Sequence, residues 1–174
     1  GLSAEQVNVY AKPEFNSNQM KLIEDGFING LSIEQVSMYA KPELDQNQMR
    51  EIRDGFKNGF KKGLSMEQVS VYAKPEFNSS QMAVIKNGFE NNLSIEQVGV
   101  YAKSDFDQWQ MNEIENGLIN GLSMEQVSVY AKPEFNSSQM EVLKDALRSG
   151  LSIEQVIMCA KPELDNVQMW EIRD

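Results

Sequence analysis

The amino-acid sequence predicts an all-α protein, a right-handed α-solenoid of six helix-turn-helix repeats, and three observations lead to this prediction. A short motif recurs along the whole chain, each copy carries two helix start signals, and the apolar residues of each copy follow helical spacing. The chain has 174 residues, 41% of them hydrophobic and 24% charged. This composition is typical of a folded globular protein, and the length suits one short solenoid domain.

The motif Gly-Leu-Ser-x-Glu-Gln-Val recurs every 29 residues, except that the second copy runs 33 and that Asn92 once replaces the glycine. A fixed period in this range is typical of stacked repeats, because one copy cannot bury its apolar face alone. We expect one domain, residues 1–174, built from the repeats 1–29, 30–62, 63–91, 92–120, 121–149 and 150–174.

The first helix of each repeat begins at a serine cap. In the first repeat Ser3 is the cap, and Gln6 three residues later completes a capping box. The helix is expected over residues 4–11, because Pro13 cannot continue it. Lys12 complements the negative C-terminal end of this helix.

The second helix of each repeat has the same start signal. Asn16 caps it and Gln19 closes the box, and Gly30 supplies the left-handed residue that ends the helix. Only two residues lead from this end to the next serine cap, so successive helices must be antiparallel. The equivalent cap pairs are Asp45 with Gln48, Asn78 with Gln81, Asp107 with Gln110, Asn136 with Gln139, and Asp165 with Gln168.

Apolar residues of the second helix, such as Met20, Ile23 and Phe27, lie at i, i+3 and i+7 on one helical face. The first helix is apolar on more than one side, so we expect it to be buried between helices. A small residue inside the second helix indicates either close approach of a neighbouring helix or simple copying of the repeat. It recurs at Gly26, Gly55, Gly88, Gly117 and Ala146.

Alternate repeats differ at one position of the second helix. The first, third and fifth repeats carry an aliphatic residue there, and the others carry Glu51, Glu113 and Glu171. The duplicated module is therefore a pair of repeats, and we expect alternate repeats to present different surfaces.

The consensus Gly-Leu-Ser-x-Glu-Gln-Val-x-x-Tyr-Ala-Lys-Pro-Glu-Phe-x-x-x-Gln-Met-x-x-Ile resembles a short repeat of uncharacterised proteins from gut bacteria and their mobile elements. The resemblance covers the whole chain and implies no particular activity. The predicted architecture is similar to tetratricopeptide-type solenoids in its stacking, although those repeats are longer, at about 34 residues, and their signature Trp and Gly positions are missing here.

The composition excludes several classes of function. Histidine is absent, which removes the commonest general base and metal ligand, and no phosphate loop, calcium loop or cysteine cluster is present. The net charge of −10 disfavours nucleic-acid binding, and no apolar run approaches the roughly 20 residues of a membrane span. We therefore expect no enzyme and no catalytic, cofactor-binding or metal-binding residue.

The single cysteine, Cys159, occupies a position that is tyrosine in every other repeat, so we interpret it as a buried substitution. One cysteine suits a reducing compartment and predicts a cytoplasmic protein. The chain begins at Gly1 without a signal-peptide pattern, which indicates either a cloning remnant or a segment of a longer protein.

Two sets of residues are candidates for partner binding. Trp109, Ile157, Val167 and Trp170 are apolar at positions that are polar in most other repeats. Such residues mark a partner surface, a self-association surface of the C-terminal repeat, the contact to a missing downstream repeat, or local packing.

The second set is a basic stripe in the extended second repeat. Arg50, Arg53, Lys57 and Lys61 follow i, i+3, i+7 and i+11 on a helix that we expect to be one turn longer than its counterparts. This stripe is either a solvated helix face or a binding site for an acidic partner.

Together these observations predict a non-catalytic protein–protein interaction scaffold that presents an extended acidic repeat surface to a basic protein or peptide. The alternative is a nucleic-acid-related role, either as a helix-turn-helix-like binder or as an acidic mimic of DNA. The first form of this alternative is disfavoured because no helix is basic enough to bind DNA.

Overall fold

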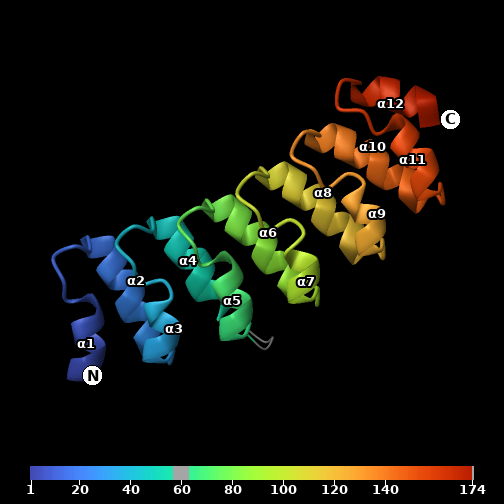
Figure 1. The fold of residues 1–174 in the computed structure, drawn as a ribbon. Coiled ribbons are helices and arrows are strands. Elements are labelled where there is room, and N and C mark those ends of the chain that lie inside the picture. Colours follow the sequence, from blue (N-terminus) through green and yellow to red (C-terminus); the bar gives the residue numbers. More distant parts are fainter. Residues whose placement is uncertain (57–62, 174) are drawn as a thin grey trace. The chain divides into compact units, whose positions relative to one another are not determined.

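The computed structural model describes residues 1–56 and 63–173, and these residues form twelve α-helices and no strand (Figure 1). The all-α prediction is therefore confirmed for the part of the chain that the structure describes. The chain divides into two compact units, residues 1–86 and 87–174.

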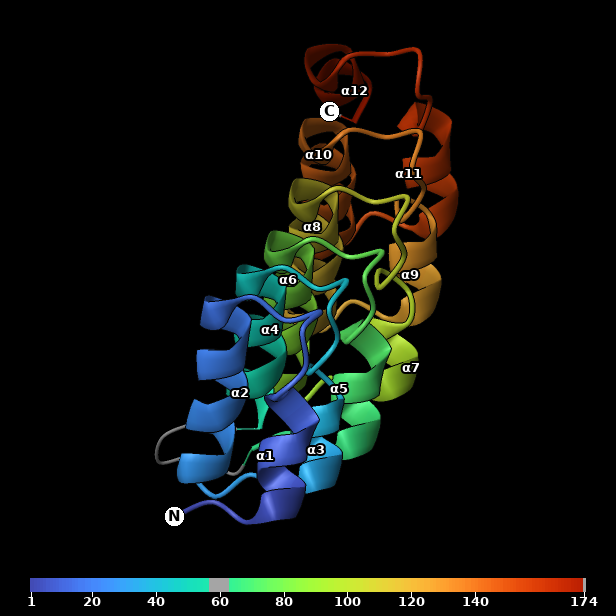
Figure 2. The ribbon, with the colours of Figure 1, turned by 90° about the vertical axis from the view of Figure 1, so that its left-hand side faces the viewer.

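In the first compact unit, short and long helices alternate. The α2 helix packs against α1, α3 and α4. Figures 1 and 2 show the short helices α1, α3 and α5 in one layer and the longer α2 and α4 in another. The helices are α1 (Ala4–Tyr10), α2 (Ser17–Ile28), α3 (Ile33–Ser37), α4 (Gln46–Gly55), α5 (Met66–Tyr72) and α6 (Ser79–Glu90), the last of which continues past residue 86.

The second compact unit has the same alternation. The α10 helix contacts α8, α11 and α12, and α9 packs against α8. Each helix pair therefore rests on the pair before it within this unit. The helices are α7 (Ile95–Val98), α8 (Gln108–Ile119), α9 (Met124–Ser128), α10 (Ser137–Arg148), α11 (Ile153–Cys159) and α12 (Asn166–Arg173).

The predicted capping boxes are confirmed. In α1 the Ser3 hydroxyl accepts from the Gln6 backbone N–H at 3.2 Å, and the Gln6 side chain accepts from the Ser3 N–H at 2.9 Å. Asn16 and Gln19 exchange the same two bonds at the start of α2. The later serine, asparagine and aspartate caps repeat this pattern, so both helix starts in each pair are satisfied locally.

The long helices α2, α6, α8 and α10 end as expected with a residue in the left-handed conformation. Gly30 has φ +85°, and Asn92, which replaces the repeat glycine, has φ +66°. The backbone N–H of Leu31 then donates to the carbonyl of Gly26 at 3.1 Å, which is the helix-closing bond of a Schellman motif.

The prediction of a longer helix in the second repeat is wrong. The α4 helix ends at Gly55, with Phe56 as its C-cap. Leu64 donates its N–H to the Gly55 carbonyl at 2.8 Å, the bond that Leu31 makes to Gly26. Nine positions separate Gly55 from Leu64, against five from Gly26 to Leu31, and the four additional residues belong to a segment, residues 57–62, that lies outside the described residues.

Close helix approach explains the recurring glycine. Tyr39 is fully buried, and its hydroxyl donates to the Leu22 carbonyl of α2 at 3.4 Å. A Cβ added at Gly26 would collide with that hydroxyl. The same collision would occur between Gly55 and Tyr72, Gly88 and Tyr101, and Gly117 and Tyr130.

The fifth helix pair carries Ala146 at the glycine position, and the next pair carries Cys159 at the tyrosine position. Both residues are buried, and the Cys159 thiol donates to the Val156 carbonyl at 3.1 Å. The interpretation of Cys159 as a buried substitution is therefore confirmed. The added methyl of alanine is accompanied by the loss of the tyrosine ring.

Candidate interaction surface

Both tryptophans of the chain are exposed. Trp109 is 61% exposed in the first turn of α8, where its backbone N–H donates to the Asp107 cap at 2.8 Å. Trp170 is 42% exposed on α12. Because a tryptophan side chain is largely buried in most folded proteins, two exposed ones require an explanation.

The other two apolar candidates, Ile157 on α11 and Val167 on α12, are also exposed. In this last helix pair, sequence reasoning missed two further exposed apolar residues, Met158 on α11 and Ile172 on α12. These two occupy positions that are apolar in every repeat, so composition gives no signal for them. Only their place in the last helix pair distinguishes them.

The structure separates the apolar candidates into two groups. Ile157, Val167 and Trp170 belong to α11 and α12, which pack against each other. Trp109 belongs to α8, and α10 lies between α8 and α12. Ser138 of α10 occupies the helix position of Trp109, so the intervening helix is polar at this edge.

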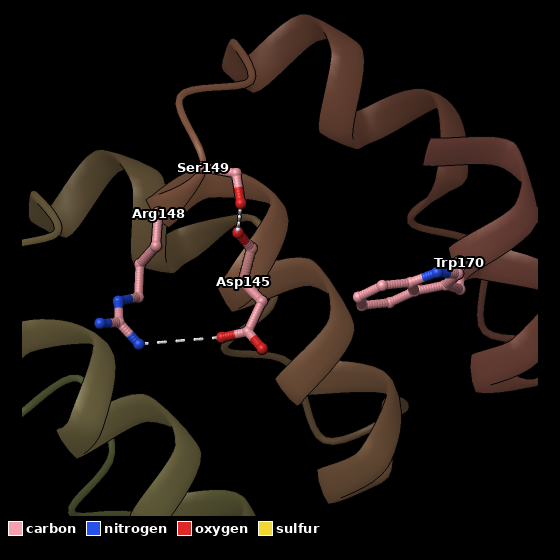
Figure 3. Close-up of a pocket in the computed structure, with 4 residues that line it drawn as sticks. All are labelled: Asp145, Arg148, Ser149 and Trp170. Atoms are coloured by element: carbon pink, nitrogen blue, oxygen red, sulfur yellow. Dashed lines mark hydrogen bonds and ion pairs between the residues drawn. The ribbon is translucent and has the colours of Figure 1, made fainter. Parts of the chain in front are cut away.

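Trp170 borders a shallow depression of about 400 Å³ (Figure 3). Its ring extends from α12 toward Asp145 of α10. Arg148 lies 3.9 Å from the Asp145 carboxylate, and the Ser149 hydroxyl donates to the Asp145 carbonyl at 2.8 Å. The depression combines an aromatic ring with both signs of charge, a setting that can accept a protruding side chain of a partner.

The basic stripe is only partly within the described residues. Arg50 is exposed on α4. Arg53 is half-buried, and its guanidinium lies 2.9 Å from the neighbouring Asp54 carboxylate, which compensates its charge. Lys57 and Lys61 lie outside the described residues, so a binding role of this stripe stays a prediction.

Exposed carboxylates recur in the first turn of the short helices. Hydrogen bonds from the Ser32 side chain and from the Glu34 backbone N–H lower the pKa of Glu34. Hydrogen bonds from the Glu154 backbone N–H and from the Ser152 side chain lower the pKa of Glu154. Glu34 and Glu154 therefore keep their charge at neutral pH. The exposed first-turn glutamates are Glu5, Glu34 and Glu67 in the first compact unit and Glu96, Glu125 and Glu154 in the second.

Glutamates of alternate repeats form ion pairs between long helices. Glu51 of α4 accepts from Lys86 of α6 at 2.6 Å, and Glu113 of α8 accepts from Lys144 of α10 at 2.5 Å. All four side chains are at least partly buried. The glutamates that distinguish alternate repeats therefore form contacts between neighbouring helices at these positions.

Glu115 of α8 is a buried carboxylate, only 2% exposed, that accepts a hydrogen bond from the Asn87 side-chain amide at 2.8 Å. Burial raises the pKa of Glu115 to about 7. The pKa of Tyr101 is also raised, mainly by burial and further by the charge of Glu115. Glu115 therefore titrates near neutral pH, and its surroundings are packed helices of the second compact unit.

Within residues 1–56 and 63–173, no group of three acidic, cysteine or histidine side chains is placed to bind a metal ion. The helices of this same part are all too short or too polar to cross a membrane. Comparison with protein-family models, curated proteins and solved structures finds no match. The resemblance to the short repeats of gut bacteria stays a prediction.

Proposed function

We propose that this protein is a non-catalytic scaffold for protein–protein interaction. In this proposal the six repeats stack as one right-handed α-solenoid, residues 1–174, and present an extended acidic surface to a basic protein or peptide. The observation that carries the proposal is the exposure of both tryptophans, Trp109 and Trp170, on long helices whose other copies are mostly polar at these positions.

The exposed glutamates of the short helices supply the second element of the proposal. One such residue stands in each repeat, and the chain carries a net charge of −10. A row of negatively charged carboxylates attracts a basic partner and raises its association rate, whereas buried aromatic contacts slow its dissociation. We therefore assign steering to the glutamates and anchoring to Trp109 and Trp170.

Affinity capture from the native host with mass-spectrometric identification tests this function. We expect wild-type protein to capture a basic protein at low salt, and we expect recovery to fall as the salt concentration rises. Trp170→Ala should reduce recovery or self-association about 10-fold while helicity stays unchanged. Trp109→Ala tests the second anchor in the same way.

Ile28→Ala is the matched control, because Ile28 is an apolar residue on α2 in the first compact unit that is at least as exposed as either tryptophan. Equal recovery with the tryptophan variants and with this control would contradict the proposal. So would tight binding of DNA in a low-salt gel shift, which would favour a nucleic-acid-binding role. Specific capture of a DNA-binding protein that DNA displaces would favour the acidic mimic of DNA.

A further inference from the structure

Glu115 is a buried acid at a position that is basic in most repeats. The position lies eight residues after the cap of the long helix, and four repeats carry a base there, namely Arg53, Lys86, Lys144 and Arg173. The first repeat carries Glu24, which is partly exposed, whereas Glu115 is only 2% exposed. Copying of a common repeat therefore does not account for a buried acid at this position.

Glu115 receives little compensation from its neighbours. The side-chain amide of Asn87, near the end of α6, donates to its carboxylate at 2.8 Å, which is the one hydrogen bond to this side chain among the described residues. Tyr101, in the turn after α7, is fully buried, and burial and then the charge of Glu115 raise its pKa. Its hydroxyl makes no hydrogen bond to Glu115. Asn87, Tyr101 and Glu115 thus form a buried polar cluster that is short of donors for a carboxylate.

The basic groups beside this cluster are paired with other acids. Lys144 of α10 donates to Glu113 at 2.5 Å, and Lys86 donates to Glu51 at 2.6 Å. Further charged side chains of the neighbouring helices and turns keep some contact with solvent, among them Glu90, Glu96, Lys103, Asp105, Glu125 and Asp145. In the described part of the chain, no lysine or arginine therefore forms an ion pair with Glu115.

An ionised Glu115 favours any local opening that brings it into contact with water, because a buried charge without a partner is unfavourable. Burial raises the pKa of Glu115 to about 7, against the ordinary value of 4.5. Between these two values the population of such an opening should rise about 10-fold for each pH unit, and above pH 7 it should become constant. The packing of α8 around Glu115 is thus tightest when this side chain is protonated.

We infer that Glu115 is a proton-sensitive latch on α8, the helix that presents Trp109: the protonated side chain holds α8 against Asn87 and Tyr101, and the ionised side chain releases it. Trp109 lies six residues before Glu115 on this helix and is 61% exposed. Release of α8 makes the position of Trp109 less fixed. The regulatory role of the latch rests on the proposed function, in which Trp109 anchors a partner, whereas the latch itself does not.

Hydrogen exchange of the intact chain, compared at each pH with the Glu115→Gln variant, tests the latch without any partner. Glutamine keeps the shape and cannot ionise, and the comparison at equal pH cancels the intrinsic pH dependence of amide exchange. The exchange rate of α8 amides in wild-type protein, divided by that in the variant, should rise about 30-fold between about pH 5.5 and pH 8. The same ratio for α11 and α12 should stay nearly constant.

Asn87→Ala is a second variant, and it separates a latch from a merely structural role. The hydrogen bond from Asn87 lowers the pKa of Glu115, so its removal should move the levelling of α8 exchange to higher pH. A residue that only packs would change the exchange rate equally at every pH. Glu141→Gln, which removes the same charge from an exposed side chain of α10, should leave the pH profile as in wild-type protein.

The fluorescence anisotropy of Trp109 measures the effect on the proposed anchor. Trp170→Phe leaves Trp109 as the only tryptophan of the chain. Its anisotropy should fall as the pH rises through about 7, and Glu115→Gln in this background should abolish the fall. Circular dichroism at each pH confirms that every variant is folded.

Three results would overturn the inference. They are a pH profile of α8 exchange that Glu115→Gln does not alter, an equal rise of exchange in α8, α11 and α12, and an anisotropy of Trp109 that does not depend on pH. None of these results bears on the capture of a partner through Trp109 and Trp170. Failure of that capture would likewise leave the hydrogen-exchange result unchanged, so the two proposals fail separately.

Discussion

Glycine inside a helix lowers helix stability by about 1 kcal/mol relative to alanine, yet most of the long helices here contain one in their last turn. The hydroxyl of a buried tyrosine occupies the space in which a Cβ would lie, as Tyr130 does at Gly117. Where the tyrosine is replaced by Cys159, the glycine is replaced by Ala146. The two positions change together because they share one volume.

Gly117→Ala tests this shared volume. The new methyl would collide with the Tyr130 hydroxyl and lie 3.3 Å from a Leu122 methyl. Overpacking of this kind costs about 1–3 kcal/mol, more than the helix gains from alanine. We expect a net loss of up to about 2 kcal/mol in the free energy of unfolding. Denaturant titration with tryptophan fluorescence measures it, since both tryptophans lie in the same compact unit as Gly117.

The control for this prediction is Tyr130→Phe. In the Gly117→Ala background, removal of the hydroxyl should restore part of the lost stability. In the wild-type background the same change removes the hydrogen bond to the Glu113 carbonyl and should be neutral or destabilising. The shared-volume explanation would be rejected if Tyr130→Phe lowered stability equally in both backgrounds.

A second prediction concerns Glu115 and the pH dependence of the free energy of unfolding. Its folded-state pKa of about 7 lies above the ordinary value of 4.5, so the folded protein binds more protons between these two pH values. The stability that Glu115 contributes is therefore complete below pH 4.5 and is lost as the pH rises through about 7. Glu115→Gln should flatten this slope and raise the free energy of unfolding by about 1–3 kcal/mol above neutral pH.

Denaturant titrations across this pH range, followed by tryptophan fluorescence, measure the effect. Glu125→Gln provides the control, because it removes the same charge from an exposed side chain of the same compact unit. If both variants gained the same stability at every pH, relief of the general negative charge, and not burial of Glu115, would be the cause.

At the scale of single elements, the sequence predicts helix starts well because a capping box is local. Serine or asparagine and a glutamine three residues later contain all the groups that exchange the two bonds, as Ser3 and Gln6 do. The end of α4 could not be predicted in this way. It depends on the bond from Leu64 to Gly55, which joins residues on either side of an insertion whose own sequence looks helical.

The residues of the candidate surface could likewise be predicted only where the sequence at their own position is unusual. Trp109 and Trp170 stand out because they differ from the other copies of their own position. Met158 and Ile172 do not differ, and they are exposed because no further helix pair packs on α11 and α12 within the described residues. Glu51 differs from its neighbours in sequence, but its partner Lys86 could be found only from the register between α4 and α6.

At the scale of the whole molecule, the contacts of each compact unit run mainly between successive helix pairs. In the second unit α10 contacts α8 on one side and α12 on the other, and Gln139 ties α10 to the turn of the next pair. Such a structure gains stability from each pair and from each interface between neighbours. A local defect should then weaken the pairs beside it more than distant ones.

Hydrogen exchange in the Gly117→Ala variant tests this expectation. The substitution disturbs the contact between α8 and the Tyr130 region, so amide exchange should accelerate most in α8 and α9, less in α10, and least in α11 and α12. In the first compact unit, α1 to α3 should exchange as in wild-type protein. Wild-type protein at a urea concentration that lowers its stability equally is the control, because urea weakens all pairs at once. If amide exchange accelerated evenly throughout the second compact unit, its helices would open only together. That result would contradict the expectation that a local defect weakens mainly the helix pairs beside it.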